Sequence, residues 1–170
     1  MSGTPAWLRG AVPGIAPYLQ PVAHALIDAR EAIERVSVPD DSVWVRPGGA
    51  ASVGFHLRHI GRSLERFLTY ARGEALTPEE LERVQHEGDP GTPPEPLARL
   101  VTEAQAAIEH TLTTLRTVRA DELLLPRSVG RRQLPTTVLG IFSHAAEHTA
   151  RHVGQLATTA RLVGVRAESC

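Results

Sequence analysis

The chain has 170 residues, of which 42% are hydrophobic and 22% are charged, a composition that is typical of a globular protein and excludes a disordered one. The formal net charge of −1 excludes a broadly basic surface, so we expect no nucleic-acid partner. All 18 basic residues are arginine, which excludes a lysine Schiff base and a Walker-type lysine.

Four segments carry the apolar spacing of amphipathic helices, at residues 17–36, 50–72, 96–119 and 135–163. The connection between the second and third contains the sequence TPEE, in which Thr77 can cap a short extra helix and Pro78 can begin it. Residues 121–135 interrupt the helical pattern, and no run alternates polar and apolar residues over the length of a strand. We therefore predict an all-α fold, a four-helix bundle with one short extra helix between helices two and three, forming a single domain over residues 1–170.

The fourth segment contains the sequence SHAAEHTARHVGQL, in which His144, His148 and His152 follow one another at intervals of four residues. Neighbours in such a series are about 6 Å apart along a helix, so two of their imidazoles can bind one metal ion, whereas the outer two, about 12 Å apart, cannot. The apolar residues of this helix place His152 on the buried face, His148 at its edge and His144 towards solvent. We therefore expect His148 and His152 to face the interior of the bundle.

A third ligand should come from another helix, since two imidazoles rarely hold a divalent ion alone. The second segment offers His56 and His59 in the sequence HLRHIGRS, on one flank of its apolar face. The positions of the apolar residues slightly favour His56 as the residue that reaches the fourth helix. A single buried histidine is usually only hydrogen-bonded within a core, but five histidines on two helices favour a metal site.

Two segments, SVGFHLRHIGRSLERFLTYARGE and LPTTVLGIFSHAAEHTARHVGQL, resemble the DinB/YfiT-like superfamily. Members of that superfamily are four-helix bundles, typically dimers, that hold a divalent metal ion with three histidines. The resemblance implies His59 as one ligand, through the family motif H-[IL]-x-x-S, and His148 and His152 as the other two. It leaves His56 and His144 as alternate ligands or as residues that support the ligands.

The resemblance also implies a kind of chemistry, because some relatives resemble thiol-dependent S-transferases or isomerases that use a low-molecular-weight thiol such as mycothiol or bacillithiol. We therefore expect a homodimer that binds a divalent transition metal, Zn or Ni before others, and that acts on a small-molecule substrate. A low-molecular-weight thiol is the leading cofactor or substrate. The sequence assigns no catalytic acid, base or nucleophile.

Two alternatives remain open. The sequence HAAEH matches the H-x-x-E-H pattern of inverted zinc proteases, in which His144 and His148 would bind the metal and Glu147 would be the base. Against it, Glu147 would point about 100° away from His148, and Glu168 is the one acidic residue that follows. In the second alternative the metal only joins two helices of a non-catalytic bundle or binding protein, but three ligands with an open position favour chemistry.

The single cysteine, Cys170, excludes an intramolecular disulfide and fits a reducing cytoplasm. The first 20 residues have neither the charged start nor the continuous apolar run of a signal peptide. No segment approaches the roughly 20 consecutive apolar residues of a membrane span. We therefore expect a cytoplasmic protein without a membrane partner.

Overall fold

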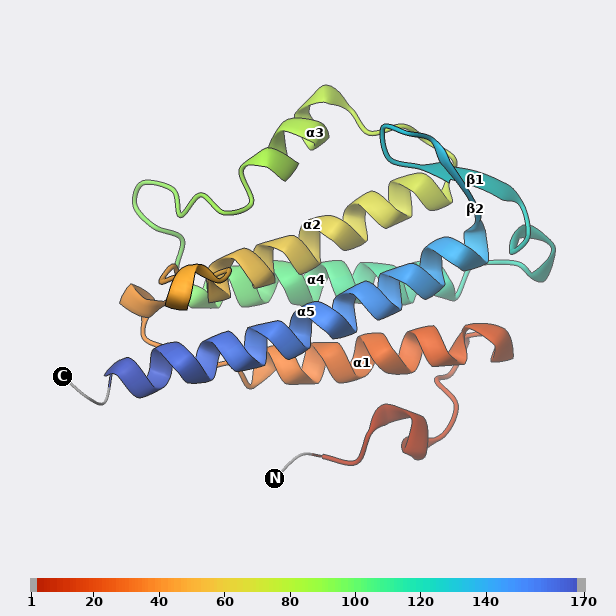
Figure 1. Cartoon of the computed structure of the whole chain (residues 1–170). Helices are drawn as coiled ribbons and strands as arrows, with labels where there is room; N and C mark the ends of the chain where they lie inside the picture. Colours follow the sequence, from red (N-terminus) through yellow and green to blue (C-terminus); the bar gives the residue numbers. More distant parts are fainter. Residues whose placement is uncertain (1–2, 168–170) are drawn as a thin grey trace.

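The structure is a computed structural model, which describes residues 3–167, with side chains described as far as residue 164. Four long helices lie side by side along one axis (Figure 1). They are α1 (Gln20–Glu34), α2 (Val53–Ala71), α4 (Leu97–Leu115) and α5 (Val138–Ala167). The predicted all-α four-helix bundle is therefore confirmed.

The order of the helices around the bundle decides which of them can share a site. The α1 helix packs mainly against α4 and α5, and α2 packs mainly against the same two helices. The α1 and α2 helices are thus at opposite corners, and α2 and α5 are neighbours. Their buried faces meet in a core that consists mainly of Leu, Val, Ile and Ala and includes Phe142.

The connection between α2 and α4 is long because these two helices run in the same direction (Figure 1). The chain must therefore return along the whole bundle before α4 can begin. The return includes the predicted extra helix, α3 (Pro78–Gln85), and the hydroxyl of Thr77 accepts a hydrogen bond from the amide of Glu80 at its start. The carboxylate of Glu80 in turn accepts one from the amide of Thr77, which completes a capping box.

A two-stranded antiparallel hairpin, β1 (Pro126–Val129) and β2 (Leu134–Thr137), occupies the segment that we expected to lack strands. That expectation was wrong because four residues are too few for an alternating pattern to be recognised. Both strands are edge strands, where a missing N–H is tolerated, so Pro126 and Pro135 fit there. The fourth helix accordingly begins at Val138 and not at residue 135.

None of the described helices is both long and apolar enough to cross a membrane. Two residues used in the sequence analysis, Glu168 and Cys170, lie outside the described residues.

Candidate metal centre

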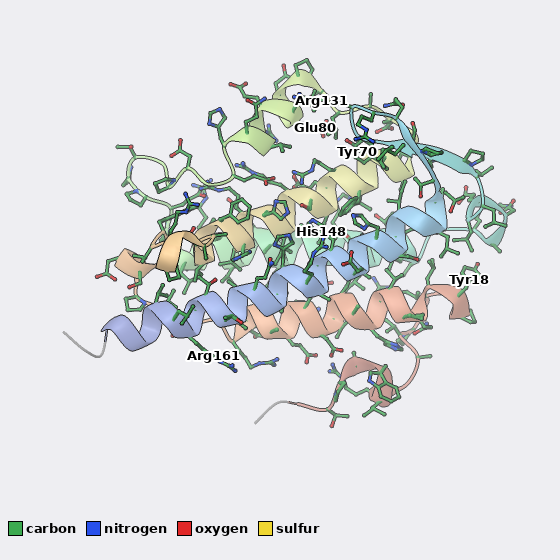
Figure 2. All side chains as sticks on the ribbon, viewed as in Figure 1. Tyr18, Tyr70, Glu80, Arg131, His148 and Arg161 are labelled. Carbon is green, nitrogen blue, oxygen red and sulfur yellow. The ribbon has the colours of Figure 1, made fainter. Side chains whose placement is uncertain are left out.

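The α2 and α5 helices bring three of the predicted histidines together. The α2 helix begins after Ser52, whose hydroxyl accepts a hydrogen bond from the amide of Phe55 at 3.1 Å. This cap fixes the start of the helix and places His59 on the side facing α5. His148 lies in the first half of α5, on the side next to α2 (Figure 2). One ring nitrogen from each of His59, His148 and His152 lies within 4.8 Å of the others.

The spacing of these nitrogens fits a bound ion. The Nε2 atoms of His59 and His148 are 3.3 Å apart. Two nitrogens on a tetrahedral zinc ion, each with a bond of 2.0–2.1 Å, would be about 3.3–3.4 Å apart. The ring centroid of His152 lies 4.4 Å from the ring centroid of His59 and 4.6 Å from the ring centroid of His148. The three residues could therefore hold one ion without a rearrangement of the helices.

A carboxylate that the sequence analysis did not identify fixes the orientation of His59. The side chain of Glu87 is only 4% exposed, and its Oε2 lies 2.6 Å from Nδ1 of His59. Because a carboxylate only accepts hydrogen bonds, Nδ1 of His59 carries the proton. In neutral His59, Nε2 therefore keeps its lone pair and faces His148. This is the arrangement by which a carboxylate selects the tautomer of a metal-binding histidine.

Arg66 holds both Glu87 and a serine in place around His59. One of its guanidinium nitrogens donates to Oε1 of Glu87 at 2.7 Å, and another donates to the hydroxyl of Ser63 at 2.8 Å. Ser63 is the serine of the H-[IL]-x-x-S motif, and its hydroxyl lies 3.4 Å from Nε2 of His59. The serine of that motif thus lies beside the imidazole of the motif's own histidine.

Glu87 belongs to the return connection, and Arg58 anchors that connection to α2. The Arg58 guanidinium donates to the carbonyls of Glu87 and Asp89 and to the carboxylate of Glu95. It also lies over the ring of Trp44, 4.5 Å from the centroid, and the Trp44 indole donates to the carbonyl of Glu95. No periodic pattern in the sequence marks Glu87, since its position depends on these long-range contacts.

His56 contacts His152 but does not belong to the group of three histidines whose ring nitrogens lie close together. It is 4% exposed, and its Nδ1 lies 3.2 Å from Nδ1 of His152. That contact lies at Nδ1 of His152, and Nε2 is the nitrogen of His152 that His56 does not contact. Although the positions of the apolar residues slightly favoured His56, the group of close nitrogens contains His59 instead. His56 is the more deeply buried of the two, as those positions indicated, but it supports His152.

His144 is outside the group, and its surroundings do not suit the H-x-x-E-H alternative. Its side chain is 54% exposed and lies 3.4 Å from the carboxylate of Glu147. Glu147 is exposed as well and forms a second ion pair with Arg151. The base required by that alternative is therefore on the surface, away from His148 and His152.

Burial keeps the imidazoles of His56, His148 and His152 neutral. Desolvation first, and the neighbouring His152 and His59 second, lower the pKa of His148 to about 3. Desolvation and the nearby His59 likewise lower the pKa of His56 and that of His152 to about 4 each. At neutral pH these rings therefore present lone pairs. Burial alone would raise the pKa of Glu87, but the hydrogen bonds from His59 and Arg66 outweigh it and lower that pKa.

Two phenylalanines of α2 border the histidines. The Phe55 ring stacks on His59, with centroids 5.2 Å apart and planes at 14°. The Phe67 ring is nearly perpendicular to His148, with centroids 5.6 Å apart. They shield the imidazoles from water on both sides, which strengthens electrostatic interactions at the site.

Comparison with curated proteins finds no match to the chain. The family model for the DinB superfamily matches residues 25–156, which include all of the histidines of the site and most of the bundle. This match agrees with the sequence motifs around His59 and His148 and with the helical architecture. The chain belongs to the DinB superfamily.

Proposed function

We propose that His59, His148 and His152 bind one divalent transition metal, Zn or Ni before others, and that the protein is a metal-dependent enzyme acting on a small molecule. The observation that carries the proposal is the convergence of three ring nitrogens within 4.8 Å, with the tautomer of His59 set by Glu87. Zinc sites with three protein ligands and an open position are typical of catalysis, whereas structural sites usually have four.

The residues around the group support an open site. Within residues 3–164, no fourth histidine, cysteine or carboxylate joins the three close nitrogens. His56 is turned towards Nδ1 of His152, and Glu87 is turned towards Nδ1 of His59. Both residues orient ligands, so neither needs to fill a coordination position.

A thiol-dependent transfer is the reaction class that we favour, with a low-molecular-weight thiol as cofactor or substrate. A bound metal would supply the positive charge that lowers the pKa of a thiol and holds it as a thiolate. The neutral state of His148 and His152 suits this role, because neither imidazole must lose a proton before it binds the metal. The chain's own residues would bind the metal, hold it in place and exclude water from the site.

The first test is the metal content of the purified protein and of single alanine variants, measured by elemental mass spectrometry. We expect about one metal ion per chain in the wild type, its loss in H59A, H148A and H152A, and its retention in the matched control H144A. Absence of metal after reconstitution with Zn, Ni and Mn would refute the proposal. Loss in H144A with retention in H152A would favour the H-x-x-E-H alternative.

A metal-loaded protein would then be assayed for transfer of different thiols to a panel of electrophiles. Turnover that depends on the thiol supports the transferase, and hydrolysis without a thiol contradicts it. Inactivity in every assay favours the non-catalytic, metal-stabilised bundle. The homodimer and the cytoplasmic location remain predictions, and light scattering of the purified protein and localisation in the cell test them.

A further inference from the structure

A cavity of about 300 Å³ lies where the β1–β2 hairpin meets α2 and α5. Figure 1 shows the hairpin at the end of the bundle where α2 finishes and α5 begins. We name this cavity the hairpin pocket. Its walls include Phe67, Val129, Leu134, Gly140, Ile141 and His144.

The hairpin pocket and the histidine cluster share a wall. The ring of Phe67 lines the pocket and lies nearly perpendicular to both His144 and His148, with centroid distances of 5.2 and 5.6 Å. The centroids of His144 and His148 are themselves 5.6 Å apart, one helical turn along α5. His148 itself does not line the pocket, so a molecule held at the three histidines would reach the pocket by passing the ring of Phe67.

Most side chains of the hairpin pocket are apolar, and they come from α2, β1, β2 and α5. Val129 and Leu134 are cross-strand partners and form the last pair before the turn of the hairpin. Leu134 is 49% exposed, so its side chain forms an accessible apolar part of the pocket wall. No charged side chain lines the pocket, and its polar groups are the hydroxyl of Thr136 and the imidazole of His144.

A glycine lets the hairpin approach α5 closely. A Cβ atom on Gly140 would lie 2.5 Å from the hydroxyl oxygen of Thr136. Any larger residue would therefore force the Thr136 side chain to turn away from the first turn of α5. The absence of a side chain at Gly140 lets the Thr136 hydroxyl pack against α5 at the pocket wall.

We propose that the hairpin pocket binds an aryl or branched alkyl group of the same small molecule whose polar end lies at His148. This inference rests on the proposed metal-dependent function and specifies its substrate class as organic molecules that carry both an apolar group and a metal-binding end. A buried apolar cavity of roughly 150 Å³ can hold a benzene molecule, so the pocket has room for a ring with a short linker. Each methylene that enters it should tighten binding about fourfold.

The test is equilibrium binding of thiols to the Co(II)-loaded protein, monitored through the visible absorption of the cobalt. The probes are 2-mercaptoethanol, benzyl mercaptan, 2-phenylethanethiol and 3-phenylpropanethiol. We expect at least one of the three phenylalkyl thiols to bind more than tenfold tighter than 2-mercaptoethanol, with an optimum at one linker length.

Variants of two exposed leucines show whether the preference comes from the pocket. Leu134→Glu places a charge on the pocket wall and should reduce the affinity for the phenylalkyl thiols to that for 2-mercaptoethanol. Leu124, which is 73% exposed and does not line the pocket, provides the matched control Leu124→Glu, which should keep the preference. Since both side chains are exposed, both variants should fold.

The outcomes separate the pocket from the metal centre. A normal cobalt spectrum with equal affinity for all the thiols, or a preference that survives in Leu134→Glu, overturns the pocket and leaves the metal centre standing. Failure to bind Co(II) overturns the metal centre. In that case, an NMR titration of the same protein with toluene tests the pocket. Shifts of the Val129, Leu134 and Ile141 amide signals would support it, and unchanged signals would overturn it.

Discussion

Oε2 of Glu87 and Nδ1 of His59 lie 2.6 Å apart, although the two residues are 28 positions apart and belong to different elements. One is on α2 and the other is in the connection that returns along the bundle. The contact joins the folding of that connection to the geometry of the histidine cluster. The centre therefore depends on more of the chain than the two helices that carry its imidazoles.

We expect Glu87→Gln to lower the affinity for metal about 10–100-fold, because the neutral amide no longer favours the Nδ1-protonated tautomer of His59. The measurement is competition with a chromophoric chelator. Glu74→Gln is the control, since Glu74 pairs with Arg72 on the surface and should keep its affinity. Equal affinities of Glu87→Gln and the wild type would show that the contact does not act on the site.

Removal of the Arg58 guanidinium should loosen the return connection more than the bundle. In Arg58→Met the carbonyls of Glu87 and Asp89 lose their donor, and Glu95 loses its buried partner. We expect faster amide hydrogen exchange in residues 86–95 and a loss of roughly 1–3 kcal/mol in the free energy of unfolding. Arg161→Met, at an exposed position of α5, should change neither, and unchanged exchange in Arg58→Met would contradict the anchoring role.

The metal-free protein should lose stability as the pH falls from about 6.5 towards 4. The unfolded chain binds protons at its histidines near pH 6.5, whereas the folded chain holds the pKa of His148 at about 3 and that of His152 at about 4. The unfolded state thus binds more protons across this window, so protonation favours unfolding. Above about pH 6.5 the contribution of these rings to stability is fully present.

Thermal unfolding in metal-free buffer between pH 4 and 8 measures this effect. His148→Asn should show a shallower fall in Tm with decreasing pH than the wild type does. His110→Asn, at an exposed position on α4, should retain the wild-type slope. A slope in His148→Asn identical to that of the wild type would show that His148 titrates normally in the folded protein.

Two glycines of α2 should respond to alanine in opposite directions. A Cβ on Gly54 would lie 2.7 Å from the Trp44 ring, whereas a Cβ on Gly61 would have its nearest neighbour, the Cα of Ala104, at 3.6 Å. We expect Gly54→Ala to destabilise the protein by about 1–3 kcal/mol through overpacking. Gly61→Ala should stabilise it by up to about 1 kcal/mol, since alanine favours a helix. Urea unfolding of both variants measures the two changes, and a stable Gly54→Ala would show that Trp44 moves freely.

The sequence predicted those features that arise within one segment. The four helices follow from their own apolar spacing, and the capping box at Thr77 follows from residues three positions apart. The histidines of α5 were correctly divided into an inner pair and an exposed His144 by the same spacing. Local periodicity is enough for such features because one helix determines them.

Features that depend on the meeting of distant segments were not predicted. His56 and His59 lie on one flank of α2, and the angle at which α5 crosses decides which of them faces His148. Spacing alone slightly favoured His56, and the family motif was needed to point to His59. Glu87 carries no local signal at all, because the contacts of Arg58 and Arg66 with the return connection place it.

The two parts of the return connection should differ in their tolerance of cuts and insertions. None of the residues of α3 is buried, and its cap is formed by its own neighbours, so a peptide inserted there would leave the bundle unchanged. The part from His86 to Glu95 is fixed to Arg58 and supplies the carboxylate beside His59. A circular permutant opened within α3 would therefore keep the carboxylate of Glu87 beside His59, whereas one opened a few residues later would separate the two side chains.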